Sequence, residues 1–164
     1  MNRLKVLFLC THNSARSQIA EGLLGHFFRG KYEVFSAGSS PTQVHPLAIK
    51  VMSEIGIDIS KKRSKNIKEF RNKDIDIVVT VCSSNTKVIC PFCASPMIRG
   101  RPEIINVILP GAKHYFHQAF DDPSEVEGTD EERMAAFRQV RDDIEKWIFS
   151  FFANLKIDNS KSQV

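Results

Sequence analysis

Residues 4–17 read LKVLFLCTHNSARS, and this stretch decides the fold. Its first six residues are almost all apolar, which is typical of a strand buried inside a parallel sheet. After a polar loop, apolar residues recur at helical spacing and predict a helix from about Ser17 to Phe28. The chain therefore opens with a strand, a loop and a helix, and Cys10 stands where the strand ends.

The same alternation continues along the chain. Further strands are expected at 32–36, at 75–81 and, more weakly, at 113–116. A helix opens at Pro46 and stops at Gly56. Thr129 followed by Glu132 has the spacing of a capping box, which predicts a long amphipathic helix ending near Leu155. Strands alternating with helices predict a single α/β domain, with a mainly parallel four-stranded sheet flanked by helices.

Length and composition set the limits of this domain. The chain has 164 residues, 42% of them hydrophobic and 26% charged, which excludes a disordered or coiled-coil protein. We expect one domain over residues 1–157 and a flexible tail over 158–164. Four prolines and two glycines between residues 91 and 111 predict an irregular insertion, about 93–108, outside the packed core.

Charge and hydropathy bear on location and partners. The net charge of +4 is too small to predict a nucleic-acid binder. The seven basic residues between Lys61 and Lys73 are expected to form a solvated face. Since the sequence has no cleavable signal pattern and no apolar run of membrane-spanning length, we expect no membrane association and a cytoplasmic location. Thiols stay reduced there, which favours catalytic, metal-binding or inert cysteines over a disulfide framework.

The loop after the first strand has the features of an oxyanion site. Cys10 and Arg16 are separated by five residues whose backbone N–H groups can surround a tetrahedral anion in front of a helix N-terminus. The same positive field favours a thiolate at Cys10, and Arg16 can grip two oxygens of the anion. We expect Ser17 to hydrogen-bond the thiolate and Asn13 to hold the loop shape. The anion-binding set is Thr11, His12, Asn13, Ser14, Ala15 and Arg16.

Two more residues occupy positions that are typical of catalytic groups. Asp122 precedes Pro123 in the loop before the final helix, where a carboxylic acid could protonate a departing oxygen. Cys82 ends a second interior strand, as Cys10 ends the first. Because ligands bind at the carboxyl ends of parallel strands, Cys10 and Cys82 are expected to face one pocket.

Several motifs resemble a known family. Residues 10–17, SAG at 36–38, GIDIS at 56–60 and FDDP at 120–123 are similar to the low-molecular-weight protein tyrosine phosphatase superfamily. VTVC at 79–82, CPF at 90–92 and FRQVRDDI at 137–144 resemble its thioredoxin-coupled arsenate reductases. The resemblance implies a monomeric enzyme without a bound cofactor, which reduces arsenate to arsenite and is recharged by thioredoxin or a similar external dithiol.

The resemblance also implies roles for single residues. Cys10 would be the nucleophile, Arg16 the anion clamp and Asp122 the general acid. Cys82 would attack the Cys10 adduct, and Cys90 would then form a disulfide with Cys82. Residues eight apart on a helix lie about 12 Å apart, and disulfide Cα atoms must approach within about 7 Å. The segment 83–89 is therefore expected to be non-helical or to rearrange.

Two other functions remain open. A tyrosine phosphatase needs only Cys10, Arg16 and Asp122, although Ser124-Glu125-Val126 lacks the aromatic residues that flank a phosphotyrosine in such enzymes. A zinc-bound regulatory domain is the second. Cys93 creates a Cys-x-x-Cys pair with Cys90 and is either an extra redox thiol or a zinc ligand beside Cys82 and His114 or His117. Without a second close ligand pair in the sequence, no metal is expected.

Overall fold

The computed structural model describes residues 3–83, 90–94 and 97–157. Its central sheet contains four parallel strands in the order β2-β1-β3-β6. These strands are β1 (Leu4–Cys10), β2 (Tyr32–Gly38), β3 (Ile77–Thr80) and β6 (His114–His117). Each coincides with a strand that the sequence predicts, so the α/β fold is confirmed.

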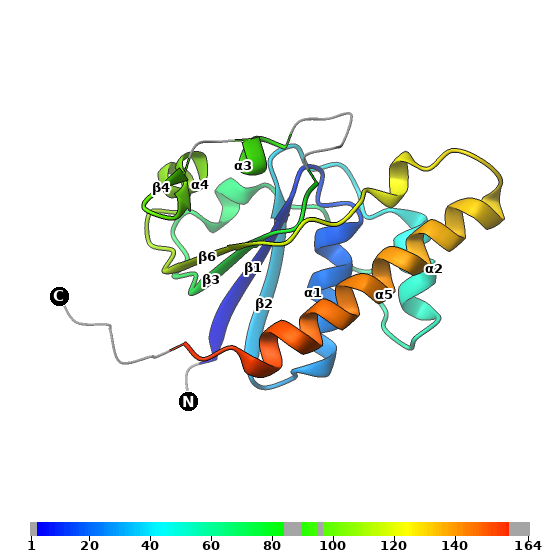
Figure 1. Cartoon of the computed structure of the whole chain (residues 1–164), viewed down its shortest axis with the longest axis horizontal. Helices are drawn as coiled ribbons and strands as arrows, with labels where there is room; N and C mark the ends of the chain where they lie inside the picture. The colour runs from blue at the N-terminus through cyan, green and yellow to red at the C-terminus, as the bar shows by residue number, and fades with distance from the viewer. Residues whose placement is uncertain (1–2, 84–89, 95–96, 158–164) are drawn as a thin grey trace.

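Helices cover both faces of this sheet. The longer ones are α1 (Arg16–Phe27), α2 (Pro46–Ser53) and α5 (Asp130–Asn154), and there are two short 3₁₀ turns, η1 (Ile67–Phe70) and η2 (Pro123–Glu125). As expected, Thr129 and Glu132 form a capping box at the start of α5: the Glu132 N–H donates to Thr129 Oγ1 at 3.2 Å, and the Thr129 N–H donates to Glu132 Oε2 at 2.8 Å. Figure 1 shows α1 and α5 packed together on one side of the sheet.

Alternating side chains on the strands fill the two halves of the core. Phe8 of β1 meets Trp147 and Phe152 of α5, with ring centroids 6.5 and 6.1 Å apart. Phe35 of β2 points to the opposite face, where its ring lies 5.5 Å from that of Phe70 in η1. Since the strands are parallel, their carboxyl ends meet at one edge of the sheet (Figure 1), and the loops after β1, β3 and β6 gather there.

The segment 91–111 corrects one expectation. It holds α3 (Pro91–Ala94), a hairpin of β4 (Met97–Ile98) and β5 (Arg101–Pro102), and α4 (Glu103–Ile108). Phe92, Ile105 and Leu109 are buried in the core. The expected irregularity over 93–108 is corrected: the range holds β4, β5 and α4, Pro102 caps α4, and Ile105 packs into the core although most other described side chains of the range stay partly or fully exposed.

A two-residue turn closes the hairpin in this segment. Arg99 and Gly100 both have positive φ, at 50° and 77°, as a type I′ turn requires. Glycine at the second position makes this backbone inexpensive. The segment is thus locally regular although its composition is typical of a loop.

Two further expectations concern residues that the structure does not describe. The tail predicted over 158–164 and most of the segment 83–89, which we expect to be non-helical, lie outside the described residues. Within the described part of the chain, no helix combines the length and apolar character needed to cross a membrane.

Candidate active site

The loop between β1 and α1 turns its carbonyl groups outward. Backbone N–H groups of the segment 40–45 donate to the carbonyl oxygens of Thr11, His12 and Ser14 at 2.9, 3.2 and 2.9 Å. Among the residues that the structure describes, no hydrogen bond uses the backbone N–H groups of residues 12–15. The loop therefore presents successive free donors at the N-terminus of α1, which is the arrangement that binds an oxyanion.

Asn13 holds this loop in shape. Its φ is 49°, in the left-handed region that asparagine tolerates better than most residues. Its side-chain Oδ1 accepts hydrogen bonds from Gln18 Nε2 at 3.0 Å and from the Lys65 N–H at 2.9 Å. Its carbonyl oxygen accepts from Ser64 Oγ at 2.7 Å. Through these contacts Asn13 ties the loop to Ser64 and Lys65.

Gly38 allows the loop to lie close to β2. A Cβ atom at this position would come within 2.5 Å of the Thr11 carbonyl oxygen and 2.9 Å of the Asn13 nitrogen. Both neighbours are backbone atoms that cannot swing away. Any side chain here would therefore displace the loop, which explains a glycine at the end of β2.

Cys10 lies at the bottom of the loop, with only 3% of its surface exposed. Its Sγ is 2.8 Å from Ser17 Oγ, and Asn13 Nδ2 donates to that same hydroxyl oxygen at 2.8 Å. Because the hydroxyl oxygen already accepts from Asn13, the hydroxyl hydrogen is free to point at the sulfur. Ser17 is therefore placed to donate to the Cys10 sulfur.

Arg16 and Asp122 come together across this site. Arg16 is 4% exposed, and its guanidinium donates to Asp122 Oδ2 at 2.8 Å and to the Phe120 carbonyl oxygen at 3.1 Å. The other carboxylate oxygen, Asp122 Oδ1, accepts from the N–H and the hydroxyl of Ser124 at 3.0 and 2.6 Å. The acid loop is thus fixed against the residue expected to hold the anion.

These side chains line one small cavity of about 70 Å³. It combines the expected residues Cys10, His12, Ser14, Ala15, Arg16 and Asp122 with three that the sequence reasoning missed, Thr42, His45 and Ser124. None of the described lining residues is Phe, Tyr or Trp. The cavity is thus polar, small and suited to a tetrahedral anion.

His45 is the most informative of the missed residues. Its Nδ1 accepts a hydrogen bond from the Leu47 N–H at 3.1 Å and so caps α2. Its ring lies 4.7 Å from that of Phe137. Burial lowers the pKa of His45, which favours the neutral ring. The His45-Pro46 pair at a predicted helix start was the available signal, but its position beside the cavity depends on the tertiary fold.

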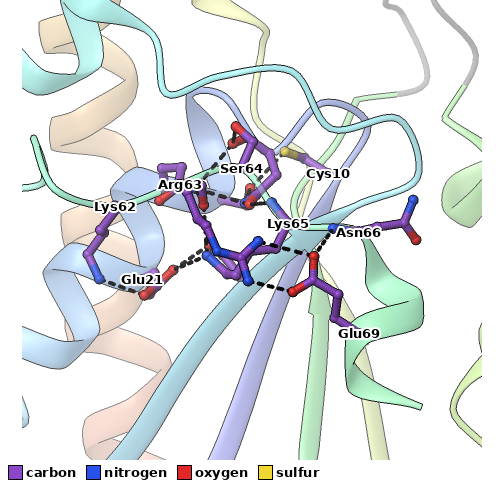
Figure 2. A network of polar contacts seen from close by, with 12 residues as sticks. Cys10, Glu21, Lys62, Arg63, Ser64, Lys65, Asn66 and Glu69 are labelled. Carbon is purple, nitrogen blue, oxygen red and sulfur yellow. Dashed lines mark hydrogen bonds and ion pairs between the residues drawn. The ribbon is translucent and has the colours of Figure 1, made fainter.

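The basic segment 61–73 lies next to the loop. Figure 2 shows Lys62 and Lys65 directed at Glu21 of α1, below the Cys10 loop. The Lys62 Nζ–Glu21 Oε1 distance is 2.6 Å, and Glu21 also accepts from Ser36 Oγ. Burial lowers the pKa of Lys65. Five of the seven basic residues in this segment are exposed, as expected for a solvated face, whereas Glu21 on α1 draws Lys62 and Lys65 partly inward.

A second group of sulfur atoms lies beyond the end of β3. Cys82 is 1% and Cys90 is 2% exposed, and their Sγ atoms are 2.6 Å apart, with Cys82 donating. This hydrogen bond raises the pKa of Cys82 and lowers that of Cys90. Leu9 of β1 pairs with Thr80 of β3, so Cys10 lies one residue and Cys82 two residues beyond this pair on adjacent strands. Cys82 is not among the described residues that line the Cys10 cavity, so the expectation that both cysteines face one pocket is not met by this cavity.

Cys93 completes a group of three thiols. The Sγ atoms of Cys82, Cys90 and Cys93 all lie within 4.8 Å of one another. Of the two histidines considered as zinc ligands, His117 has its Nδ1 3.8 Å from Cys93 Sγ. His114 pairs with Ile77, at the opposite end of β3, and is too far along the strand to join them. The structure therefore removes His114 from the candidate ligands.

Comparison with known proteins identifies the family of this chain. Residues 5–161 match the family described as low molecular weight phosphotyrosine protein phosphatase. An arsenate reductase of Halalkalibacterium halodurans is 42% identical over 151 residues, which cover 92% of this chain and 96% of the relative. One from Bacillus subtilis is 37% identical over 139 residues, covering 85% and 88%.

Solved structures show the same fold. A structure described as an arsenate reductase in the phosphate binding state has a TM-score of 0.66 and 31% identity, covering 93% of this chain and 99% of the other. A low molecular weight protein tyrosine phosphatase from T. tengcongensis has a TM-score of 0.66 at 22% identity, which bears on the fold alone. By its sequence over residues 5–161, the chain belongs to the low molecular weight phosphotyrosine protein phosphatase family.

Proposed function

We propose that this protein reduces arsenate to arsenite with electrons from its own thiols. The observation that carries the proposal is the thiol pair of Cys82 and Cys90, buried at the end of the strand beside Cys10. A phosphatase has no use for these thiols, whereas a reductase must supply two electrons. The relatives named arsenate reductase, at up to 42% identity, support the same choice.

The first step uses the cavity around Cys10. Arsenate binds to the N–H groups of residues 12–15 and to Arg16, and the Cys10 sulfur attacks arsenic. One arsenic–oxygen bond breaks, and Asp122, when protonated, gives the departing oxygen its proton. Arg16 has five N–H donors, so it can hold the anion while it keeps its bond to the Phe120 carbonyl oxygen. The product is a Cys10–arsenic adduct.

The second step reduces arsenic. Cys82 attacks the Cys10 sulfur, a Cys10–Cys82 disulfide forms, and the arsenic–sulfur electron pair stays on arsenic, which leaves as arsenite. The hydrogen bond from Cys82 to Cys90 gives the Cys82 proton an acceptor, and the same bond lowers the pKa of Cys90.

The third step frees Cys10. Cys90 gives up its proton and attacks the Cys82 sulfur; the Cys10–Cys82 bond breaks, and Cys10 leaves and takes up a proton, so that a Cys82–Cys90 disulfide remains. Cys90 is proposed as this thiol because its sulfur lies 2.6 Å from that of Cys82, whereas the Cys93 sulfur contacts the Cys82 carbonyl oxygen at 3.5 Å. An external dithiol protein such as thioredoxin then reduces the disulfide, with the enzyme working as a cytoplasmic monomer without a bound cofactor.

Turnover with purified partners tests this proposal. Arsenate is supplied with thioredoxin, thioredoxin reductase and NADPH, and NADPH oxidation is followed for the wild type and for Cys10→Ser, Cys82→Ser and Cys90→Ser. We expect arsenate-dependent turnover in the wild type and its loss in all three variants. Turnover that survives in Cys82→Ser would exclude the relay.

Hydrolysis of phosphotyrosine is the second candidate function, because Cys10, Arg16 and Asp122 alone could carry it out. The absence of an aromatic ring among the described cavity residues argues against it. Hydrolysis of p-nitrophenyl phosphate, measured in the same preparations, separates the two functions. Brisk hydrolysis that is indifferent to Cys82→Ser, without arsenate reduction, would identify a phosphatase.

A further inference from the structure

The relay described above leaves Cys93 without a role. It lies on α3, where the chain turns back toward the end of β3, and its sulfur is within 4.8 Å of those of Cys82 and Cys90. Three thiols from two separate segments thus converge on one point. A relay between Cys82 and Cys90 requires only two of them.

The number and type of these ligands select the ion that they can bind. Thiolates are soft ligands and favour thiophilic ions. Structural zinc sites almost always take four protein ligands, and no fourth His, Cys, Asp or Glu joins this group within the described residues. His117 comes within 3.8 Å of Cys93 only, and its Nδ1 is 2.7 Å from Thr80 Oγ1. Trivalent arsenic bonds to three sulfur atoms and keeps a lone pair in the fourth direction.

The site has an entrance on the Cys93 side. Cys82 and Cys90 are buried, whereas Cys93 is half-buried and lines a cavity of about 260 Å³ together with Thr80, Tyr115 and His117. A small neutral molecule such as arsenous acid could reach Cys93 first and then exchange onto the two inner thiols. Charge would not oppose this entry, because arsenous acid is uncharged at neutral pH.

We propose that Cys82, Cys90 and Cys93 of the reduced protein bind arsenite as an arsenic trithiolate. One As(OH)₃ and three thiols give one As–S₃ group and three water molecules, so no electron is transferred. The three-thiol site exists only in the reduced protein. When Cys82 and Cys90 form a disulfide, Cys93 is the one free thiol that remains at this site. The physiological meaning rests on the proposed function: arsenite, the product, would occupy both relay thiols and inhibit further turnover.

Arsenite binding to the reduced protein tests this directly. The protein is reduced, freed of reductant under argon, equilibrated with arsenite and assayed for bound arsenic by elemental analysis. Alkylation followed by peptide mass spectrometry then shows which thiols are protected. We expect one arsenic per chain, protection of Cys82, Cys90 and Cys93, and free alkylation of Cys10.

Two variants sharpen the result. Cys10→Ser keeps the three thiols and should bind arsenite as the wild type does. Cys93→Ser should weaken binding by more than about 100-fold, because even residues that merely support a ligand contribute about 10- to 100-fold. The protection pattern of the wild type gives the same information if Cys93→Ser does not fold.

Three outcomes would overturn the inference: Cys93 alkylated at its free rate in saturating arsenite, binding that disappears in Cys10→Ser, or protection of all three thiols by Zn²⁺ alone but not by arsenite. Arsenate turnover of the wild type is measured separately. Turnover without arsenite retention defeats this inference only, and retention without turnover defeats the proposed function only.

Discussion

At the scale of single residues, the hydrogen bonds around Cys10 place the Ser17 hydroxyl next to its sulfur. Asn13 donates to the Ser17 hydroxyl, so that hydroxyl can donate to Cys10. The residue types were readable from the sequence, and so was their proximity in one loop. The direction of each hydrogen bond was not, because it depends on contacts to the distant segment 63–66.

Replacing Ser17 tests this orientation. Ser17→Ala removes the donor to the sulfur, and a hydrogen bond to a charged group is worth about 1.5–3 kcal/mol. We expect kcat for arsenate to fall by about 10- to 100-fold. Ser39→Ala is the matched control, since Ser39 Oγ makes only a 3.5 Å contact with the Thr11 carbonyl oxygen. Equal kinetics for the two variants would contradict the assignment.

Arg16 gives a second prediction at this scale. Arg16→Lys keeps the positive charge but loses the planar pair of donors that can hold two oxygens of an anion. We expect KM for arsenate to rise by about tenfold or more, with the fold intact by circular dichroism. Wild-type KM in this variant would show that the backbone N–H groups alone hold the anion.

At the scale of elements, the contact between β2 and the oxyanion loop links the fold to the site. Gly38→Ala would place a Cβ within 2.5 Å of the Thr11 carbonyl oxygen. Overpacking of this kind costs about 1–3 kcal/mol. We expect that loss of unfolding free energy in urea titration, together with weaker anion binding.

The control for this variant lies on α1. Gly25→Ala fills open space on an exposed helical position and should raise the unfolding free energy by about 0.5–1 kcal/mol. If both variants changed stability in the same direction, the close approach of β2 and the loop would not be the cause.

Helices and strands were predicted well where apolar residues recur at regular spacing. They were predicted poorly where many prolines and glycines suggested a loop. β1, α1 and α5 follow from apolar spacing and a capping box. The short elements of the segment 91–111 could not be predicted in this way, because its prolines lie at element boundaries and its hairpin depends on a two-residue turn at Arg99-Gly100. The burial of Phe92 in the core results from tertiary packing, which local composition does not show.

At the scale of the whole molecule, ion pairs connect the end of α2 to α5. Glu54, just beyond α2, accepts from Arg138 at 2.8 Å and from Arg141 at 3.0 Å. Arg141 is 8% exposed and also donates to the Val51 carbonyl oxygen at 2.8 Å. The hydrogen bond from Arg138 lowers the pKa of Glu54, so folding favours its ionised form.

This pair predicts a pH dependence of stability. Because the pKa of Glu54 is lower in the folded protein, its contribution is complete above the unfolded value and is lost as the pH falls through the folded value. Glu54→Gln should lower the unfolding free energy at neutral pH by up to about 1 kcal/mol, the scale of exposed ion pairs. Urea titrations should show the difference shrinking below about pH 4. A difference that grows on acidification would contradict this sign.

The position of the thiols is also a property of the whole molecule. The sequence places Cys10 and Cys82 at strand ends, and parallel strand order predicts that they share an edge of the sheet. The sequence raised a grouping of Cys82, Cys90 and Cys93 only as one alternative, because the approach of the three thiols depends on how the segment 91–111 folds back.

A single turnover without external reductant tests the central claim most directly. Reduced protein is mixed with excess arsenate, arsenite is counted per chain, and disulfides are mapped by mass spectrometry. We predict one arsenite released per chain and a Cys82–Cys90 disulfide in the protein. No arsenite, with Cys82 and Cys90 still free thiols, would contradict the account.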